Sequence, residues 1–161
     1  MHLAQLNVAR MVAPLDDPVM ADFKNALGPI NELAESTPGF VWRLKGSDDD
    51  PTALVDHDYG DFAVTYSIWE SRQALWDFIY RTGHLPYLRR RREWFHHTTL
   101  PSAVLWWVEE GEIPSLKHGL ERLEHLREHG PTPHAFTFKD FYETTTIPRH
   151  ISSWVPSPQT T

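Results

Sequence analysis

The chain has 161 residues, which is the usual size of one domain and enough to bury a hydrophobic core. Hydrophobic residues make up 40% of it and charged residues 23%, as in an ordinary soluble globular protein. The net charge of −7 argues against general nucleic-acid binding, because neutralising phosphates requires surplus lysine and arginine. The chain contains no cysteine, which excludes disulfides, thiolate metal sites and cysteine nucleophiles.

The N-terminal stretch MHLAQLNVAR lacks the basic and apolar regions of a signal peptide. No apolar run approaches the roughly 18–20 residues that a membrane-spanning helix requires. We therefore expect a cytoplasmic protein that binds neither membranes nor nucleic acid.

Four stretches alternate apolar and polar residues or are almost continuously apolar, as expected of strands. They are His2–Arg10, Phe40–Lys45, Phe62–Trp69 and Ala103–Val108. In the first strand Gln5 and Asn7 share one face. Their amides then lie either in solvent or in a cavity, and the sequence alone favours solvent.

Helical spacing of apolar residues predicts helices over residues 18–36, 71–81, 84–97 and 115–129. Asp16 or Asp17, Ser71 and Ser115 are placed to cap three of them. Pro29 lies inside the first helix and cannot donate to its hydrogen-bond ladder, so we expect a kink or a break there.

Three further segments lie outside this pattern. The alternating aromatics of Ala135–Phe141 predict a short strand or an extended cover. The run Asp48–Asp50 lacks the ligand spacing of a calcium loop and is expected to be a solvated loop. We expect one domain over residues 1–142 and a loosely ordered tail, rich in Thr, Ser and Pro, over residues 143–161.

The expected fold class is α+β. The order βαββαβ predicts a ferredoxin-like antiparallel sheet with helices on one face, followed by an extra C-terminal helix and a short strand. The other face of the sheet carries Trp and Leu and cannot stay exposed to water. Burial of this face against a second subunit predicts a homodimer.

The join Trp69-Glu70-Ser71-x-x-Ala74, in this order of elements, resembles the dimeric α+β barrel superfamily, which includes antibiotic-biosynthesis and haem-degrading monooxygenases. Over residues 2–141 the chain is more similar to a bacterial family, the DUF3291 proteins. The segments that carry this resemblance are YRTGHLPYLRRRREWF, LWWVEEGEIP and RLEHLREHGPTPHAFTF.

The resemblance also implies site residues. Haem-degrading members use an Asn on the first strand, a Trp on the second long helix and an axial His beyond it. Asn7 matches the first, Phe78 stands where the Trp is expected, and His84 matches the third only with a gap. The missing Trp argues against haem degradation but leaves haem binding open, because one neutral imidazole suffices as a proximal ligand.

His84 follows a glycine at a helix junction and is the main candidate for chemistry. It is expected to act as a general base or an axial ligand, or else to be a histidine bonded to backbone at a helix start. Within the basic run at 89–92, Arg91 or Arg92 is expected to point inward and hold an anionic group of the ligand.

The other histidines are weaker candidates for a metal site. His96 and His97 are adjacent and point about 100° apart on a helix, which is poor geometry for one metal. His125 and His129 are spaced to share a metal, but a surface role is favoured because the sequence marks no third ligand.

Aromatic side chains are dense between positions 66 and 107. They line either a pocket for a flat aromatic ligand or an aromatic core or dimer interface. The predicted ligand-binding residues are Trp69, Trp76, Phe78, Tyr80 and Trp106, with Arg91 and Arg92.

The leading functional hypothesis is a small-molecule-binding barrel with one apolar pocket between sheet and helices. It would carry out cofactor-independent oxygenation of an aromatic or polycyclic substrate, with Asn7 and His84 as catalytic residues. The first alternative is a haem-binding protein with His84 as the axial ligand. The second is a non-catalytic dimeric ligand-binding module.

Overall fold

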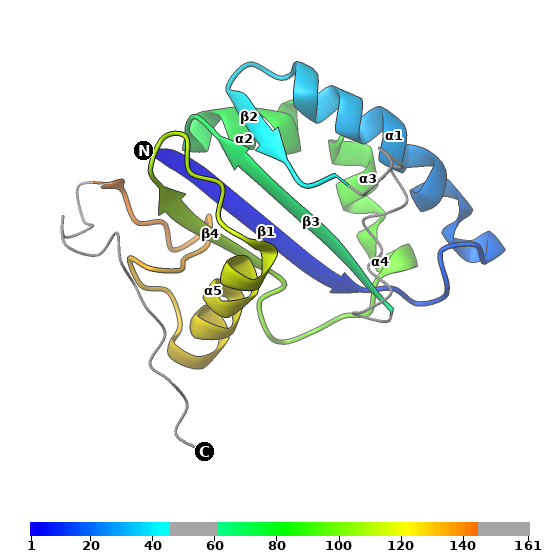
Figure 1. Ribbon diagram of the computed structural model, residues 1–161. Helices are drawn as coiled ribbons and strands as arrows, with labels where there is room; N and C mark the ends of the chain where they lie inside the picture. Colours follow the sequence, from blue (N-terminus) through cyan, green and yellow to red (C-terminus); the bar gives the residue numbers. More distant parts are fainter. Residues whose placement is uncertain (46–60, 145–161) are drawn as a thin grey trace.

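The computed structural model describes residues 1–45 and 61–144, and its centre is a four-stranded antiparallel sheet (Figure 1). The strands are β1 (His2–Arg10), β2 (Phe40–Arg43), β3 (Phe62–Trp69) and β4 (Ala103–Val108). Their order across the sheet is β2-β3-β1-β4, so β1 is a central strand and pairs with both β3 and β4. This confirms the predicted strands and the ferredoxin-like order.

Helices cover both faces of the sheet (Figure 1). One face carries α1 (Ala21–Ser36), preceded by the 3-10 turn η1 (Pro18–Met20), and α2 (Arg72–Arg81), α3 (Leu85–Arg89) and α4 (Arg91–Trp94). The opposite face carries α5 (Leu116–His129). The two helices of the βαββαβ unit thus lie on one face as predicted, and the extra C-terminal helix lies on the other.

Side-chain hydrogen bonds fix where the helices begin. Asp17 accepts from the Val19 N–H at the start of η1, Ser71 accepts from the Ala74 N–H of α2, and Ser115 caps α5. Helix α1 runs through Pro29 without a break. Pro29 is exposed, so the carbonyl that loses its partner faces water rather than the core.

Alternation along β1 sends its side chains into two different cores. Ala4 and Leu6 pack with Trp106 and with the apolar side of α5, whereas Leu3 packs with Leu75 of α2. Helix α5 lies close to the sheet at Gly119, where an added Cβ would be 3.2 Å from Leu6 and from Trp106. The sheet face that was expected to bury itself in a dimer is therefore largely covered by α5, and the homodimer stays a prediction.

Two predicted elements are shorter than expected. The helical piece at 84–97 is split at Arg90, because burial of Trp94 against Met11 and Met20 turns the chain out of a straight helix. The segment 135–141 forms one antiparallel bridge, between Phe136 and Leu105 of β4. The Asp48–Asp50 loop and almost all of the predicted tail lie outside the described residues.

Gly39 sits where β2 meets the start of α2. Its φ is +88°, and a Cβ at this position would lie 2.5 Å from the Ala74 Cβ. The Glu70 N–H donates to the Gly39 carbonyl, so the same residue ties the end of β3 to β2. A side chain at position 39 is therefore opposed by both backbone strain and a direct clash.

We predict that Gly39→Ala lowers the free energy of unfolding by about 2–4 kcal/mol, from backbone strain plus overpacking. Gly111→Ala is the matched control, because Gly111 has a similar φ of +84° with no atom within 4 Å of its added Cβ. Gly111→Ala should lower the free energy of unfolding by about 1 kcal/mol, from backbone strain alone. Equal losses in urea denaturation would contradict the packing argument.

Candidate functional site

The centre of the helix-covered sheet face is polar. Leu3, Gln5 and Asn7 share one side of β1, and Leu3 packs against α2, so Gln5 and Asn7 point to the side of the sheet on which α2 lies. Register places Gln5 opposite Ser67 of β3, and places Asn7 opposite Thr65. Both amides thus lie on the covered face and are half-buried, where the sequence favoured solvent.

Gln5 and Ser67 are held in a short hydrogen-bonded chain that begins at Trp69. The indole Nε1 of Trp69 donates to the Ser67 Oγ over 2.9 Å, and Ser67 donates to the Gln5 Oε1 over 3.1 Å. Trp69 is completely buried. The network fixes the Trp69 ring on this face of the sheet and satisfies its N–H.

Asn7 has no such support. Among the described residues its side chain makes no hydrogen bond. Its cross-strand neighbours Thr65 and Ala103 are exposed although they lie within strands. The Asn7 amide is therefore accessible and free to bind a molecule that enters from outside.

His84 lies between α2 and α3, in the helix layer that covers this face (Figure 1). Its ring centroid is 4.9 Å from that of Phe78, and Phe78 stacks on Trp69 at 5.1 Å. The His84 Nδ1 lies 3.3 Å from the Ile79 carbonyl oxygen. Burial lowers the pKa of His84, and the contact with the Ile79 carbonyl raises it in part. The imidazole is therefore neutral at neutral pH.

The structure thus brings four of the predicted residues into one layer: Asn7 from β1, Trp69 from β3, Phe78 from α2 and His84 after it. Gln5, Ser67 and Thr65 join them and were not singled out as site residues. Two signals point to them in the sequence: the pairing of Gln5 with Asn7 on one strand face, and the alternation of Phe62–Trp69. The sequence did not show which side of the sheet these residues share with the helices.

Three other predicted aromatic residues lie elsewhere. Trp106 is completely buried on the opposite face, against α5, so the sheet separates it from Trp69. Trp76 and Tyr80 contact each other in a tilted arrangement at 4.3 Å but are exposed at 36% and 38%. Trp76 also contacts the Phe138 ring, at 5.6 Å.

The arginines also differ from the prediction. Arg91 and Arg92 are both exposed, so neither points inward. The half-buried member of the run is Arg90, which bonds Asp22 and Glu93 at 2.8 Å and lies over the Trp94 ring at 4.8 Å. The reason is the break between α3 and α4, which removes the continuous helix on which the inward position was expected.

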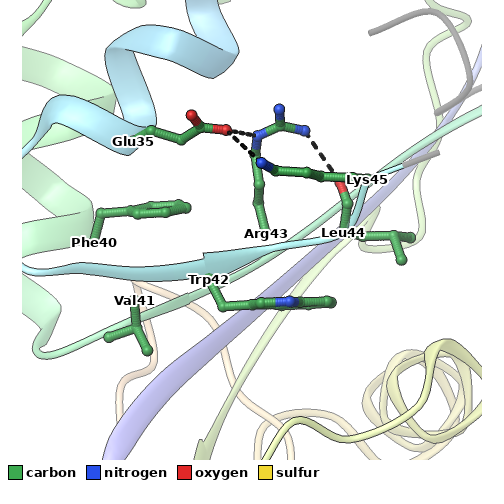
Figure 2. A pocket seen from close by; sticks show the side chains of 7 residues that line it. All are labelled: Glu35, Phe40, Val41, Trp42, Arg43, Leu44 and Lys45. Carbon is green, nitrogen blue, oxygen red and sulfur yellow. Dashed lines mark hydrogen bonds and ion pairs between the residues drawn. The ribbon is translucent and has the colours of Figure 1, made fainter. Parts of the chain in front are cut away.

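A hollow of about 600 Å³ lies along the outer edge of the sheet at β2 (Figure 2). Figure 2 shows Glu35, Arg43 and Lys45 on one side of the strand and Trp42 on the other. Glu35 pairs with Arg43 at 2.6 Å and with Lys45 at 3.6 Å, and the hydrogen bond from Arg43 lowers the pKa of this carboxyl. This hollow is not the predicted one between sheet and helices.

Three further histidines, His125, His129 and His134, lie close together near the end of α5. The rings of His125 and His129 are 4.6 Å apart, and those of His125 and His134 are 5.9 Å apart. The His125 Nε2 already bonds the Thr132 hydroxyl at 3.2 Å. No group of three or more His, Asp or Glu residues in the described part of the chain is arranged to hold a metal ion.

Residues 2–151 match the family described as "Domain of unknown function (DUF3291)". The chain belongs to this family. No curated protein matches it. No helix within residues 1–45 and 61–144 has the length and apolar character needed to cross a membrane.

Solved structures with a similar arrangement include Rv0793 from Mycobacterium tuberculosis, at 15% identity and a TM-score of 0.48, covering 70% of this chain and all (100%) of that one. SnoaB, a cofactor-independent oxygenase from Streptomyces nogalater, is 16% identical with a TM-score of 0.44. The match covers 71% of this chain and 98% of SnoaB. A monooxygenase from the gene ActVA-Orf6 of Streptomyces coelicolor, in complex with nanaomycin D, is 21% identical with a TM-score of 0.42. The match covers 71% of this chain and 92% of the monooxygenase. Similarity at this level assigns no activity to this DUF3291 protein.

We predict that His84 titrates at lower pH in the native protein than in the unfolded chain. Its native pKa lies below the ordinary value of 6.5, so its contribution to stability is complete above that pH and is lost as pH falls through the native pKa. Proton NMR titration in buffer and in urea measures both values, with His84→Gln used to assign the signal. Equal midpoints in the two states would contradict the burial of this ring.

Proposed function

We propose that the DUF3291 protein binds a planar aromatic molecule in the layer between the sheet and α1 to α4, and oxygenates it without a cofactor. The observation that carries the proposal is the half-buried Asn7 amide, which has no hydrogen-bond partner among the described residues and points to the side of the sheet on which α2 and the following His84 lie. The half-buried ring of Phe78, which stacks on Trp69, supplies an apolar surface beside His84.

In this proposal His84 is the general base. An Nδ1–H donated to the Ile79 carbonyl leaves Nε2 as the proton acceptor, and the lowered pKa keeps the ring neutral and able to accept. The Asn7 amide donates to the substrate oxygen on which negative charge develops. Because Arg91 and Arg92 are exposed, they have no part in holding that charge.

An anthrone is the simplest substrate with the required chemistry, because its methylene is acidic and its anion is electron-rich. Removal of one methylene proton gives an anion that reduces O₂. One oxygen atom ends as the new ring carbonyl and the other as water, which takes up both methylene hydrogens. Dithranol thus yields danthron and one water for each O₂, with no further reductant.

We predict that the wild-type protein accelerates oxidation of dithranol to danthron above a protein-free blank. His84→Ala should lower kcat/KM by about 10²–10⁴-fold, the usual contribution of a general base. Asn7→Ala should lower it by about 10²-fold, from loss of one donor to the developing oxyanion. Danthron absorbance and O₂ uptake report the same reaction.

The matched controls are His97→Ala and Asn25→Ala, which replace an exposed histidine and an exposed asparagine. Both should retain wild-type rates. No acceleration by the wild-type protein, or equal losses in the site and control variants, would contradict the proposal. Tight binding of danthron without turnover of dithranol would instead support a non-catalytic binding module.

Haem binding is a second candidate, favoured by one observation. The His84 Nδ1 faces the Ile79 carbonyl, an arrangement that orients many metal-bound histidines through their other nitrogen. His84 would hold the iron through Nε2 beside the Phe78 ring. Haem would then supply the redox chemistry that side chains lack.

If His84 is an axial ligand, mixing haemin with the purified protein should shift the Soret band. The shift should be lost in His84→Ala and kept in His97→Ala. The same shift in both variants would show that haemin binds without His84 and would reject this candidate.

A further inference from the structure

Helix α1 carries a polar side chain, Asn31, on its buried face. Asn31 is four residues after Leu27 and three before Ala34, so it shares a helix face with two residues that are buried. Its Nδ2 atom is buried and has no hydrogen-bond partner. No hydrogen bond from a described residue reaches its Oδ1 either, so the whole side-chain amide is without a partner among the described residues.

Two pairs of polar side chains on the same side of the sheet already bond each other. Ser67 donates to Gln5, and Arg43 of β2 is bound to Glu35 of α1. The amides of Asn7 on β1 and Asn31 on α1 differ, because neither makes a hydrogen bond to a described residue. An orphan buried N–H costs free energy and calls for an explanation.

Trp106 offers the contrast. Its Nε1 is the other buried side-chain nitrogen without a partner in the described part of the chain. A Cβ at Gly119 of α5 would lie 3.2 Å from the Trp106 ring, so the helix is packed directly onto this indole. Asn31 differs because it lies on the other side of the sheet, to which Asn7 also points.

We propose that Asn31 is a ligand-binding residue whose amide, together with that of Asn7, donates hydrogen bonds to the carbonyl or phenol oxygens of a planar aromatic ligand. This inference rests on the proposed function and names the chemistry of its ligand. The donors are two neutral amides, and the nearby cation Arg43 is already neutralised by Glu35. A neutral ketone, quinone or phenol therefore fits the site better than a carboxylate or a phosphate.

The test measures binding of danthron, by quenching of tryptophan fluorescence, together with stability in urea. Asn31→Leu removes the orphan N–H and keeps a side chain of similar size. We expect its dissociation constant for danthron to rise about tenfold, from loss of a buried hydrogen bond. Its urea midpoint should stay equal or rise, because an unsatisfied buried group is gone.

Asn25→Leu is the matched control, since Asn25 is exposed on the same helix and the substitution makes the same change in helix propensity. It should leave danthron binding unchanged. Asn31→Asp is a second variant, which removes the donor without changing the shape of the side chain, and it too should weaken binding. Rhein, the same ring system with a carboxylate, should bind the wild-type protein more weakly than danthron.

The outcomes separate this inference from the function on which it rests. If the wild-type protein does not bind danthron, the proposed function and this inference both fail. If it binds and Asn7→Ala weakens binding while both Asn31 variants bind like the wild type, only the inference fails. A lower urea midpoint with unchanged binding in Asn31→Leu would show that Asn31 has a structural role, and would also overturn it.

Discussion

The alternation of side chains along β1 is the constraint on which the rest of the structure depends. This strand is paired on both sides, so its residues can reach only the two faces of the sheet. Ala4 and Leu6 supply the core beneath α5, and Leu3 supplies the core beneath α2. A slip of one residue would send Asn7 into the α5 core and Leu6 into the polar layer.

Polarity at the centre of a covered sheet face is costly unless each group is satisfied. For Gln5 and Ser67, the hydrogen bonds of the network that starts at Trp69 offset this cost. The buried Nδ2 atom of Asn31 has no hydrogen-bond partner to offset it. Proteins tolerate such local conflicts chiefly where they serve a function, and this difference between the residues is the basis for proposing Asn31 as a ligand-binding residue.

Helix α5 gives the sheet a second covered face within a single chain. Leu123 and Leu126 of this helix are almost completely buried against Val104 and Trp106 of β4. Close approach is possible because position 119 is a glycine. The sheet face that the sequence analysis assigned to a second subunit is thus largely covered by the helix that follows β4 in the chain.

The sequence by itself determined the strands, the capped helices at Ser71 and Ser115, and hence the βαββαβ order, because these features depend on local periodicity and local hydrogen bonds. It also singled out Asn7, His84, Trp69 and Phe78 as candidate site residues, which remain predictions. Only the tertiary structure decided that α5 covers the opposite face, which moved Trp106 out of the site. It also ended the helix at Arg90, leaving Arg91 and Arg92 in solvent. The physical reason is that periodicity fixes which residues share a face, whereas packing between distant segments fixes what that face meets.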